Sequence, residues 1–342
     1  MHTLKHFLPN LSAPCVISPQ GKSAVASLDE VISWLKEQRP ALEAELQTTG
    51  AILLRGFQAI QSPEAFEAVI SAFSSQAATD EGSTSPRTAV LNQIYTSTDT
   101  PPYLPIELHQ ERSFHWQFPD KIAFFCYLPP QKDGETPIAD MRAVLKALPI
   151  DIVQRFQDKG VRLRRRLPSL DITGNKAVRT WQATFDTDSR SDVETLADKL
   201  HWELHWHKFY LEVDNCVLPP CRTHPITGEQ VWFNQAHVLH KSNLSYWAKQ
   251  SPSFKLKFIA AVAPIIEQFY YYHHTYGDNS EIALSDLEQI RQAVAKNKIM
   301  FSWQRGDVLV LDNILMAHGR NPFKGARRIL VGLIQNENLG AA

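Results

Sequence analysis

Chemistry-bearing residues are concentrated in two stretches that lie far apart in the chain. The first contains His109-Gln110-Glu111. In an extended backbone the side chains alternate between two faces, so His109 and Glu111 point to one side and Gln110 to the other. The second stretch places His318 after an apolar run and ahead of two adjacent arginines. Two imidazoles and one carboxylate are the protein ligands of the facial iron(II) site, which leaves other metal positions open for oxygen chemistry.

A histidine two residues before an acid is a weak signal on its own. The chain has 13 histidines and 36 acidic residues, and it contains a second such triplet, His201-Trp202-Glu203. The alternative is an exposed polar pair at the end of a strand. The C-terminal stretch favours the metal site, because an arginine one short strand beyond a metal-binding histidine suits a dicarboxylate cosubstrate.

Several longer segments carry a resemblance to a known family. They are Tyr95–Thr98, His109–Glu111, Gly134–Asp140, His224–Gln235, Gly306–Asn313 and His318–Arg320, followed by Arg327-Arg328. In this order, the sequence resembles the iron(II)/2-oxoglutarate-dependent dioxygenases of the taurine dioxygenase class, the TauD/TfdA family. It is most similar to the branch that contains the syringomycin-biosynthesis aspartyl hydroxylase.

The resemblance implies an α+β fold with a double-stranded β-helix (jelly roll) core flanked by helices. We expect a single domain over residues 1–342, with a long insertion or lid region at about 151–251 between the two halves of the jelly roll. Many short apolar runs separated by glycine and proline also favour a sandwich or barrel. The expected strands are 51–54, 90–95, 107–111, 121–128, 231–233, 299–303, 308–311 and 328–334.

Helix starts are marked by local capping signals. Ser27 to Glu30 forms a capping box ahead of an amphipathic stretch, and Ser62-Pro63 provides an N-cap serine and a proline at the first helical position. A second capping box begins at Ser285. The expected helices are 28–46, 63–73, 254–272 and one from the second box to 297.

The resemblance also implies how the cosubstrate is bound. The second arginine of the pair, Arg328, is expected to bind the distal carboxylate of 2-oxoglutarate, with the Thr136 hydroxyl on the same carboxylate. Alternation along the strand puts Arg328 on one face and Arg327 on the other, with the apolar set. The choice between the two arginines stays open. Glu111 argues against a halogenase, in which a small residue occupies that position.

Substrate contacts are expected from segments at the edge of the iron site. Arg112 or Arg320 would bind a substrate carboxylate, with a surface ion pair as the alternative for each. The candidate substrate residues are Asn92, Ser97, Thr98, Arg112 and Arg320.

The resulting hypothesis is an enzyme that uses iron(II), 2-oxoglutarate and O2 to hydroxylate or desaturate an unactivated C–H bond. The substrate class implied by the nearest branch is an amino acid or its derivative, free or tethered to a carrier protein, in specialised-metabolite biosynthesis. One alternative is a catabolic dioxygenase acting on a small organic acid or amine. The other is a jelly-roll protein that holds metal without turnover.

Composition excludes several other classes of function. With 44% hydrophobic and 21% charged residues and a formal net charge of -1, the chain offers no global field for nucleic acid or anionic membranes. No apolar run is long enough to span a bilayer, and the N-terminus lacks a signal-peptide pattern. The four cysteines fit free thiols, so we expect a cytoplasmic protein, and a homo-oligomer is compatible with the sequence.

Two polar runs have competing interpretations. The basic run 161–166 is either a solvated strand edge or a docking surface for an acidic partner such as a carrier protein. The run from His201 to His207 puts three histidines and Glu203 on one face of an extended chain. It is either a zinc site or a surface histidine cluster.

Overall fold

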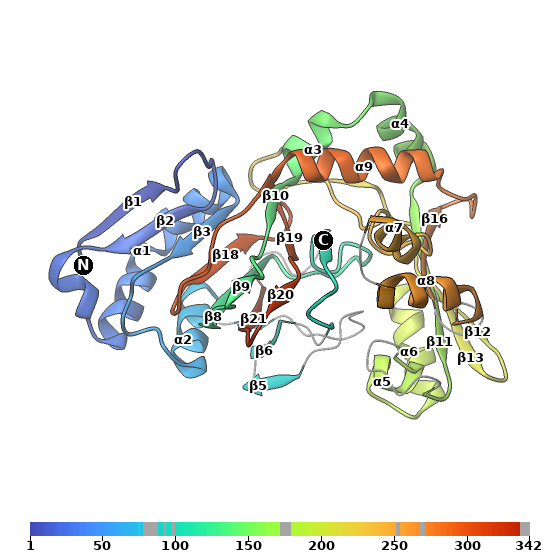
Figure 1. Ribbon diagram of the computed structural model, residues 1–342, viewed down its shortest axis with the longest axis horizontal. Helices are drawn as coiled ribbons and strands as arrows, with labels where there is room; N and C mark the ends of the chain where they lie inside the picture. Colours follow the sequence, from blue (N-terminus) through green and yellow to red (C-terminus); the bar gives the residue numbers. More distant parts are fainter. Residues whose placement is uncertain are drawn as a thin grey trace.

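A large sheet and a small sheet share the main apolar core of the protein. The computed structural model describes residues 1–74, 76–77, 88–91, 94–97, 100–171, 179–250, 254–266 and 271–335. The large sheet has the order β1-β2-β3-β18-β8-β21-β6-β5, with β4 beside β21, and the small sheet has the order β17-β10-β19-β7. Side chains of both sheets, including Phe124, Ile138 and Val331, belong to one buried cluster. The expected jelly-roll core is therefore present (Figure 1).

The strands of the two sheets are short, as the sequence pattern indicates. Those of the large sheet are β1 (Thr3–Phe7), β2 (Cys15–Pro19), β3 (Ala51–Leu54), β4 (Gln76–Ala77), β5 (Ala89–Leu91), β6 (Ile94–Thr96), β8 (Lys121–Leu128), β18 (Val308–Asp312) and β21 (Arg328–Gln335). Those of the small sheet are β7 (Ile106–His109), β10 (Ile138–Asp140), β17 (Lys298–Ile299) and β19 (Met316–Arg320). Two two-stranded sheets complete this part: β9 (Lys132–Asp133) with β20 (Phe323–Lys324), and β14 (Cys221–Thr223) with β15 (Gln230–Trp232).

Two N-terminal helices cover the outer face of the large sheet. Helix α1 (Leu28–Thr49) begins at the Ser27 capping box, and α2 (Pro63–Phe73) begins at the Ser62 cap, as predicted. Their apolar faces bury a second cluster against the sheet, with residues of β8, β18 and β21 among its members. Because side chains alternate along a strand, each central strand contributes one set of residues to each core.

Strand β21 shows this division clearly. Ile329, Val331 and Leu333 lie in the core between the two sheets. Leu330 and Ile334 lie in the core beneath α1 and α2. The odd-numbered face of β21 is therefore the face toward the small sheet, and this assignment decides which arginine enters the interior.

A third sheet stands apart from the jelly roll in the right half of Figure 1. Its order is β12-β13-β11-β16, from the strands β11 (Val161–Pro168), β12 (Glu203–Trp206), β13 (Tyr210–Asp214) and β16 (Tyr271–Tyr276). Helices α5 (Trp181–Phe185) and α6 (Arg190–Leu200) pack on it with their own apolar cluster. Strand β11 is an inner strand, so the interpretation of the basic run as a strand edge is wrong.

The remaining helices connect these parts. They are η1 (Gly21–Val25), α3 (Met141–Ala147), α4 (Ile150–Lys159), α7 (Asn243–Gln250), α8 (Phe254–Ile266) and α9 (Leu284–Lys296). The helix expected to reach residue 272 ends at Ile266, because the following chain supplies β16 to the third sheet. Helix α9 begins before Ser285 and has no side-chain cap, so the second capping box is wrong. Among the described residues, no helix is long and apolar enough to cross a membrane.

We predict that Gly319→Ala weakens both folding and metal binding. A Cβ at position 319 would lie 2.6 Å from the backbone oxygen of Ile106, so β19 would have to move away from β7. Such overpacking costs about 1–3 kcal/mol of folding free energy. Gly21→Ala is the control: its Cβ meets nothing, and its positive φ of 56° costs about 1–2 kcal/mol. Calorimetric titration of Fe(II) under anaerobic conditions should show a loss of affinity only for Gly319→Ala; equal affinity in both variants would contradict the prediction.

Candidate metal centre

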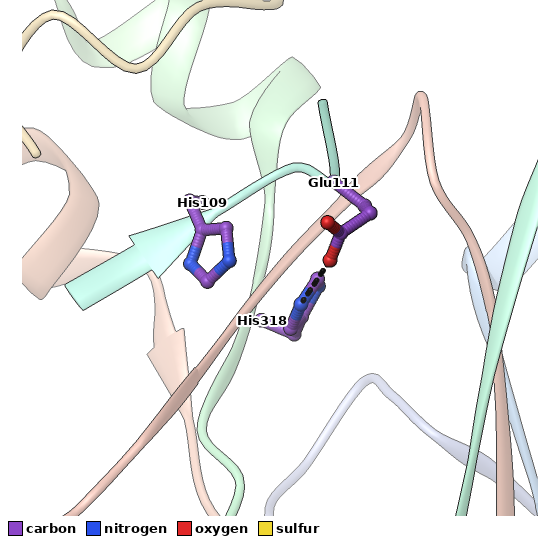
Figure 2. Close-up of side chains that lie close together, drawn as sticks. All are labelled: His109, Glu111 and His318. Carbon is purple, nitrogen blue, oxygen red and sulfur yellow. Dashed lines mark ion pairs between the residues drawn. The ribbon is translucent and has the colours of Figure 1, made fainter. Parts of the chain in front are cut away.

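Three predicted ligands meet where β7 pairs with β19. His109 and His318 are direct partners across these strands, and their ring centroids are 4.5 Å apart. Glu111 approaches from just beyond the end of β7, with its Oε2 atom 3.8 Å from Nε2 of His318 (Figure 2). One ligand atom from each residue lies within 4.8 Å of the other two. The expected strand 107–111 ends at His109, so a turn, not strand alternation, directs Glu111 to the site.

The arrangement fits one divalent ion. Bonds of about 2 Å from nitrogen or oxygen place neighbouring ligands of one ion roughly 3–4 Å apart. Nδ1 of His109 donates to the backbone oxygen of Glu107 at 2.8 Å, which leaves Nε2 with its lone pair available for a metal. Glu111 and His318 are 4% and 5% exposed, and the Phe124 ring packs 5.0 Å from that of His318. Glu111 and His318 are thus preorganised and shielded from water, and His109 is half-buried.

The backbone around Glu111 is held by Asn313, which follows β18. The Asn313 side chain accepts a hydrogen bond from the backbone N–H of Glu111 at 2.7 Å and donates one to the backbone oxygen of Glu111 at 3.0 Å. It also donates to the backbone oxygen of Pro119 at 2.8 Å. Because all these groups are buried, removing one partner would leave others unsatisfied. The Gly306–Asn313 segment therefore positions the carboxylate ligand, a role that sequence reasoning did not assign.

A second set of buried amides fixes the residue between the two ligands. Gln110 donates to the backbone oxygens of Trp232 at 3.0 Å and Ile314 at 2.7 Å. Gln235 in turn donates to the Gln110 backbone oxygen at 2.7 Å. These bonds join the chain at the ligands to the His224–Gln235 segment. That segment contributes positioning, which its sequence alone did not reveal.

The corner between β18 and β19 is stabilised by Asp312. One carboxylate oxygen accepts the N–H groups of Ile314 and Leu315, both at 2.9 Å. The other lies 3.0 Å from Nε2 of His224. This corner sets the start of β19 and hence the position of His318.

The structure places the two arginines on opposite faces of the chain. Arg328 is exposed, and its guanidinium lies 5.1 Å from the centroid of the Tyr127 ring. Arg327 is half-buried and donates to the backbone oxygen of Gly134 at 2.9 Å and to the Thr136 hydroxyl at 3.3 Å. The expectation that Arg328 points inward is wrong. Residue 327 continues the odd-numbered set of β21, which faces the core between the sheets.

Thr136 and Ser97 gather around Arg327. Thr136 is 2% exposed, and its hydroxyl accepts from both Arg327 and the indole nitrogen of Trp303, the latter at 3.1 Å. The Ser97 hydroxyl lies 3.4 Å from Nη1 of Arg327. Burial lowers the pKa of Arg327 to about 10, so its guanidinium is a cation at neutral pH. These hydrogen bonds go to neutral oxygens, and the carboxylate of Glu135 acts on the guanidinium as a nearby negative charge.

The other expected substrate residues lie in different places in the structure. Arg320 is buried and donates to the backbone oxygens of Thr100, Pro101 and Leu104 at 2.8–2.9 Å. These bonds hold the 100–104 segment, and the expected substrate contact of Arg320 stays a prediction. Arg112 is 5% exposed and has a φ of 58° directly after Glu111, so it is part of the buried turn that follows this ligand, and its substrate contact stays a prediction. Asn92 and Thr98 lie outside the described residues.

Two other groups of potential metal ligands occur among the described residues. His240, His273 and Glu281 lie together, but the Glu281 carboxylate already forms an ion pair with Lys241, with 2.9 Å between Nζ and Oε1. Glu203, His205 and Asp214 form the other.

The second group bears on the run from His201 to His207. Arg164 forms an ion pair with Asp214 at 2.5 Å. His201 ends α6 with a φ of 54°, and His207 stacks on Tyr210, so neither joins Glu203 and His205 on one face. The four-residue zinc site expected as one alternative for this run does not form.

The comparisons with known proteins agree with this geometry. A model described as the taurine catabolism dioxygenase TauD, TfdA family matches residues 12–334. The chain belongs to this family. It is an iron(II)/2-oxoglutarate-dependent dioxygenase, and its cluster of two histidines and a glutamate suits the iron that such enzymes use.

Individual relatives cover nearly the whole TauD/TfdA chain. The dapdiamide synthesis protein DdaC of Enterobacter agglomerans is 32% identical over 323 residues, which are 94% of this chain and 92% of DdaC. A clavaminate synthase-like protein of Arabidopsis thaliana is 29% identical over 328 residues, 94% of this chain and 93% of the relative. The structure of PvcB, an Fe, alpha-ketoglutarate dependent oxygenase from an isonitrile synthetic pathway, superimposes with a TM-score of 0.50 at 12% identity, covering 98% and 96% of the two chains.

We predict that His318→Ala reduces Fe(II) affinity by more than roughly 100-fold, since loss of an outer partner of a ligand alone costs about 10–100-fold. His205→Ala, which removes an exposed histidine of the third sheet, should leave the affinity unchanged. Anaerobic calorimetry with Fe(II) or Mn(II) measures both. Tight one-to-one binding by His318→Ala would exclude this centre.

Proposed function

We propose that this dioxygenase hydroxylates or desaturates an unactivated C–H bond of an amino acid or amino-acid-derived small molecule in specialised metabolism. His109, Glu111 and His318 are the proposed iron ligands. The observation that carries the proposal is their buried cluster at the β7–β19 pairing. The similarity to DdaC, a dapdiamide synthesis protein, supports the metabolic setting.

In this proposal Arg327 takes the role first expected of Arg328. Its fork would bind the distal carboxylate of 2-oxoglutarate, with the Thr136 hydroxyl beside it. A carboxylate there would give a direct ionic partner to a guanidinium whose hydrogen bonds now go to neutral oxygens. Trp303 holds the Thr136 hydroxyl from the other side and so fixes the orientation of this small anion site.

The protein positions the metal ligands and excludes water from the reaction. When bound, iron(II) with 2-oxoglutarate and O2 supplies the oxidising power, and the cosubstrate is converted to succinate and CO2. The buried ligands, the Phe124 ring and the amides of Gln110 and Asn313 hold the donor set in place before substrate arrives. Exclusion of water protects reactive species from side reactions.

We further propose that the chain is one domain and that the region at about 151–251 is an insertion that covers the metal centre. Asn215 from this region donates to the backbone oxygen of Phe114, three residues beyond Glu111. The four cysteines are free, which supports a reducing compartment such as the cytoplasm.

A free small molecule is the preferred substrate form over one tethered to a carrier protein. Two arginines of the basic run, Arg164 and Arg166, already form ion pairs with Asp214 and Glu212, at 2.5 and 2.8 Å. Guanidinium groups that are paired in this way are less available to dock an acidic carrier. Binding of carrier protein at micromolar concentration would favour the tethered form.

Two arginine variants test the cosubstrate site as a matched pair. Arg327→Ala should weaken 2-oxoglutarate binding on the order of 100-fold, because a charge-assisted fork is lost, while Fe(II) affinity stays. Arg328→Ala, at the exposed neighbour, should have no effect on either. The visible absorption that forms when 2-oxoglutarate chelates Fe(II) without oxygen gives both affinities. If Arg328→Ala weakens 2-oxoglutarate binding and Arg327→Ala does not, then Arg328 binds the cosubstrate.

The oxygenase function has its own test. Fe(II), 2-oxoglutarate and O2 should together give succinate with the wild-type chain, and His318→Ala should give none. Absence of the anaerobic absorption band and of succinate in the wild type would favour a protein that holds metal without turnover. A deletion strain separates the catabolic alternative. Loss of growth on an organic acid or amine would favour catabolism, whereas loss of a specialised metabolite would favour biosynthesis.

A further inference from the structure

A fully buried arginine lies outside the site described so far. Arg165 in β11 is 0% exposed. Among the described residues, none of its three guanidinium nitrogens has a hydrogen-bond partner. Its neighbours Arg164 and Arg166 belong to the other face of the strand and are paired with acids. Arg165 therefore takes no part in the ion pairs that neutralise the rest of the basic run.

Aromatic rings surround the Arg165 guanidinium. Its central carbon lies 4.5 Å from the centroid of the Trp202 ring and 5.7 Å from that of Phe185. A ring face attracts a cation but accepts no conventional hydrogen bond, so it does not replace the water that the ion lost. Burial lowers the pKa of Arg165 to about 10, which still leaves it charged at neutral pH. The folded chain thus holds an uncompensated buried cation.

A second unsatisfied donor lies against the same tryptophan. The His115 ring meets Trp202 edge-on at 5.4 Å, and the residue is 3% exposed. Its Nδ1 accepts the backbone N–H of Gln117 at 2.9 Å, which leaves the proton of the neutral ring on Nε2. That Nε2 atom is buried and, within the described chain, has no partner. Burial and the nearby charges of Arg112 and Arg165 keep the pKa of His115 low, near 3, so the ring is neutral.

One of these donors, His115, lies close to the metal centre along the chain. His115 ends the buried turn that begins at the ligand Glu111, and Arg112 lies between them. The Ser113 hydroxyl in the same turn is also buried without a partner in the described residues. The unsatisfied donors of Arg165 and His115 thus both lie against Trp202, and His115 belongs to the turn that follows an iron ligand.

We propose that Arg165 and His115 bind a carboxylate of the substrate, with Trp202 as the wall against which it lies. A carboxylate only accepts hydrogen bonds, matches the planar fork of a guanidinium and supplies the missing negative charge. The inference rests on the proposed function and deepens it, since it makes the substrate a small carboxylic acid of the amino-acid kind. It also assigns the carboxylate of 2-oxoglutarate and that of the substrate to different arginines, Arg327 and Arg165.

The test compares acids with their amides on the full chain loaded with Mn(II) and 2-oxoglutarate. The probes are the twenty common L-amino acids and their primary amides, and calorimetry measures binding. We expect at least one acid to bind tenfold or more tightly than its amide, and Arg165→Met to abolish this preference. The inference is overturned if no acid of the panel exceeds its amide, or if the preference survives in Arg165→Met.

Matched variants separate binding from folding. Arg164→Met, on the opposite face, should lower the melting temperature by breaking its ion pair with Asp214 but keep the acid preference. Arg165→Met should match or exceed the wild-type melting temperature without ligand, because no partner is lost; a large decrease would indicate a purely structural role. An unchanged 2-oxoglutarate absorption band with Fe(II) in Arg165→Met shows that the cosubstrate site is intact, whereas loss of the band would assign Arg165 to 2-oxoglutarate and overturn the inference.

Discussion

The close approach of β19 to β7 is the contact on which the site depends. Gly319 lets the two backbones meet where any side chain would strike Ile106, and this pairing sets His318 opposite His109. The third ligand does not lie on a strand, so its position needs separate support from Asn313 and Gln110. A metal site built from two distant pieces of chain is therefore a consequence of one strand pairing and a few buried amides.

Buried cations are the second constraint on this fold. Arg320 and Arg327 both lose water on folding, and burial lowers the pKa of each to about 10. Arg320 donates to three backbone carbonyls, which are fixed parts of the chain. Arg327 meets only one carbonyl and two hydroxyls, and Arg165 meets none. Arg320 is thus bound to fixed backbone, whereas the guanidinium of Arg165 has no hydrogen-bond acceptor among the described residues, and an anion would supply one.

The sequence predicted the jelly roll and brought the three proposed ligands into one hypothesis, because motif order and strand spacing are local signals. It did not predict which face of β21 is the interior, since Ile329 and Leu330 are both apolar and both buried. Only the packing of α1 and α2 on the even-numbered face shows that Arg327 enters the core. The roles of Asn313 and Gln110 depend on contacts with residues about 200 positions away, which no local pattern encodes.

Arg165 shows how a signal can be present and still be misread. The run 161–168 alternates, with Val161, Leu163 and Leu167 on one face and the paired arginines on the other. Alternation alone puts Arg165 on the apolar face, where a cation is costly unless an anion joins it. As one member of a basic run, Arg165 suggested an exposed surface. The alternation of the strand instead indicates that its charge is buried. Among the described residues, the Arg165 guanidinium has neither an ion pair nor a hydrogen bond, and this distinguishes it from Arg164 and Arg166 on the opposite face of β11.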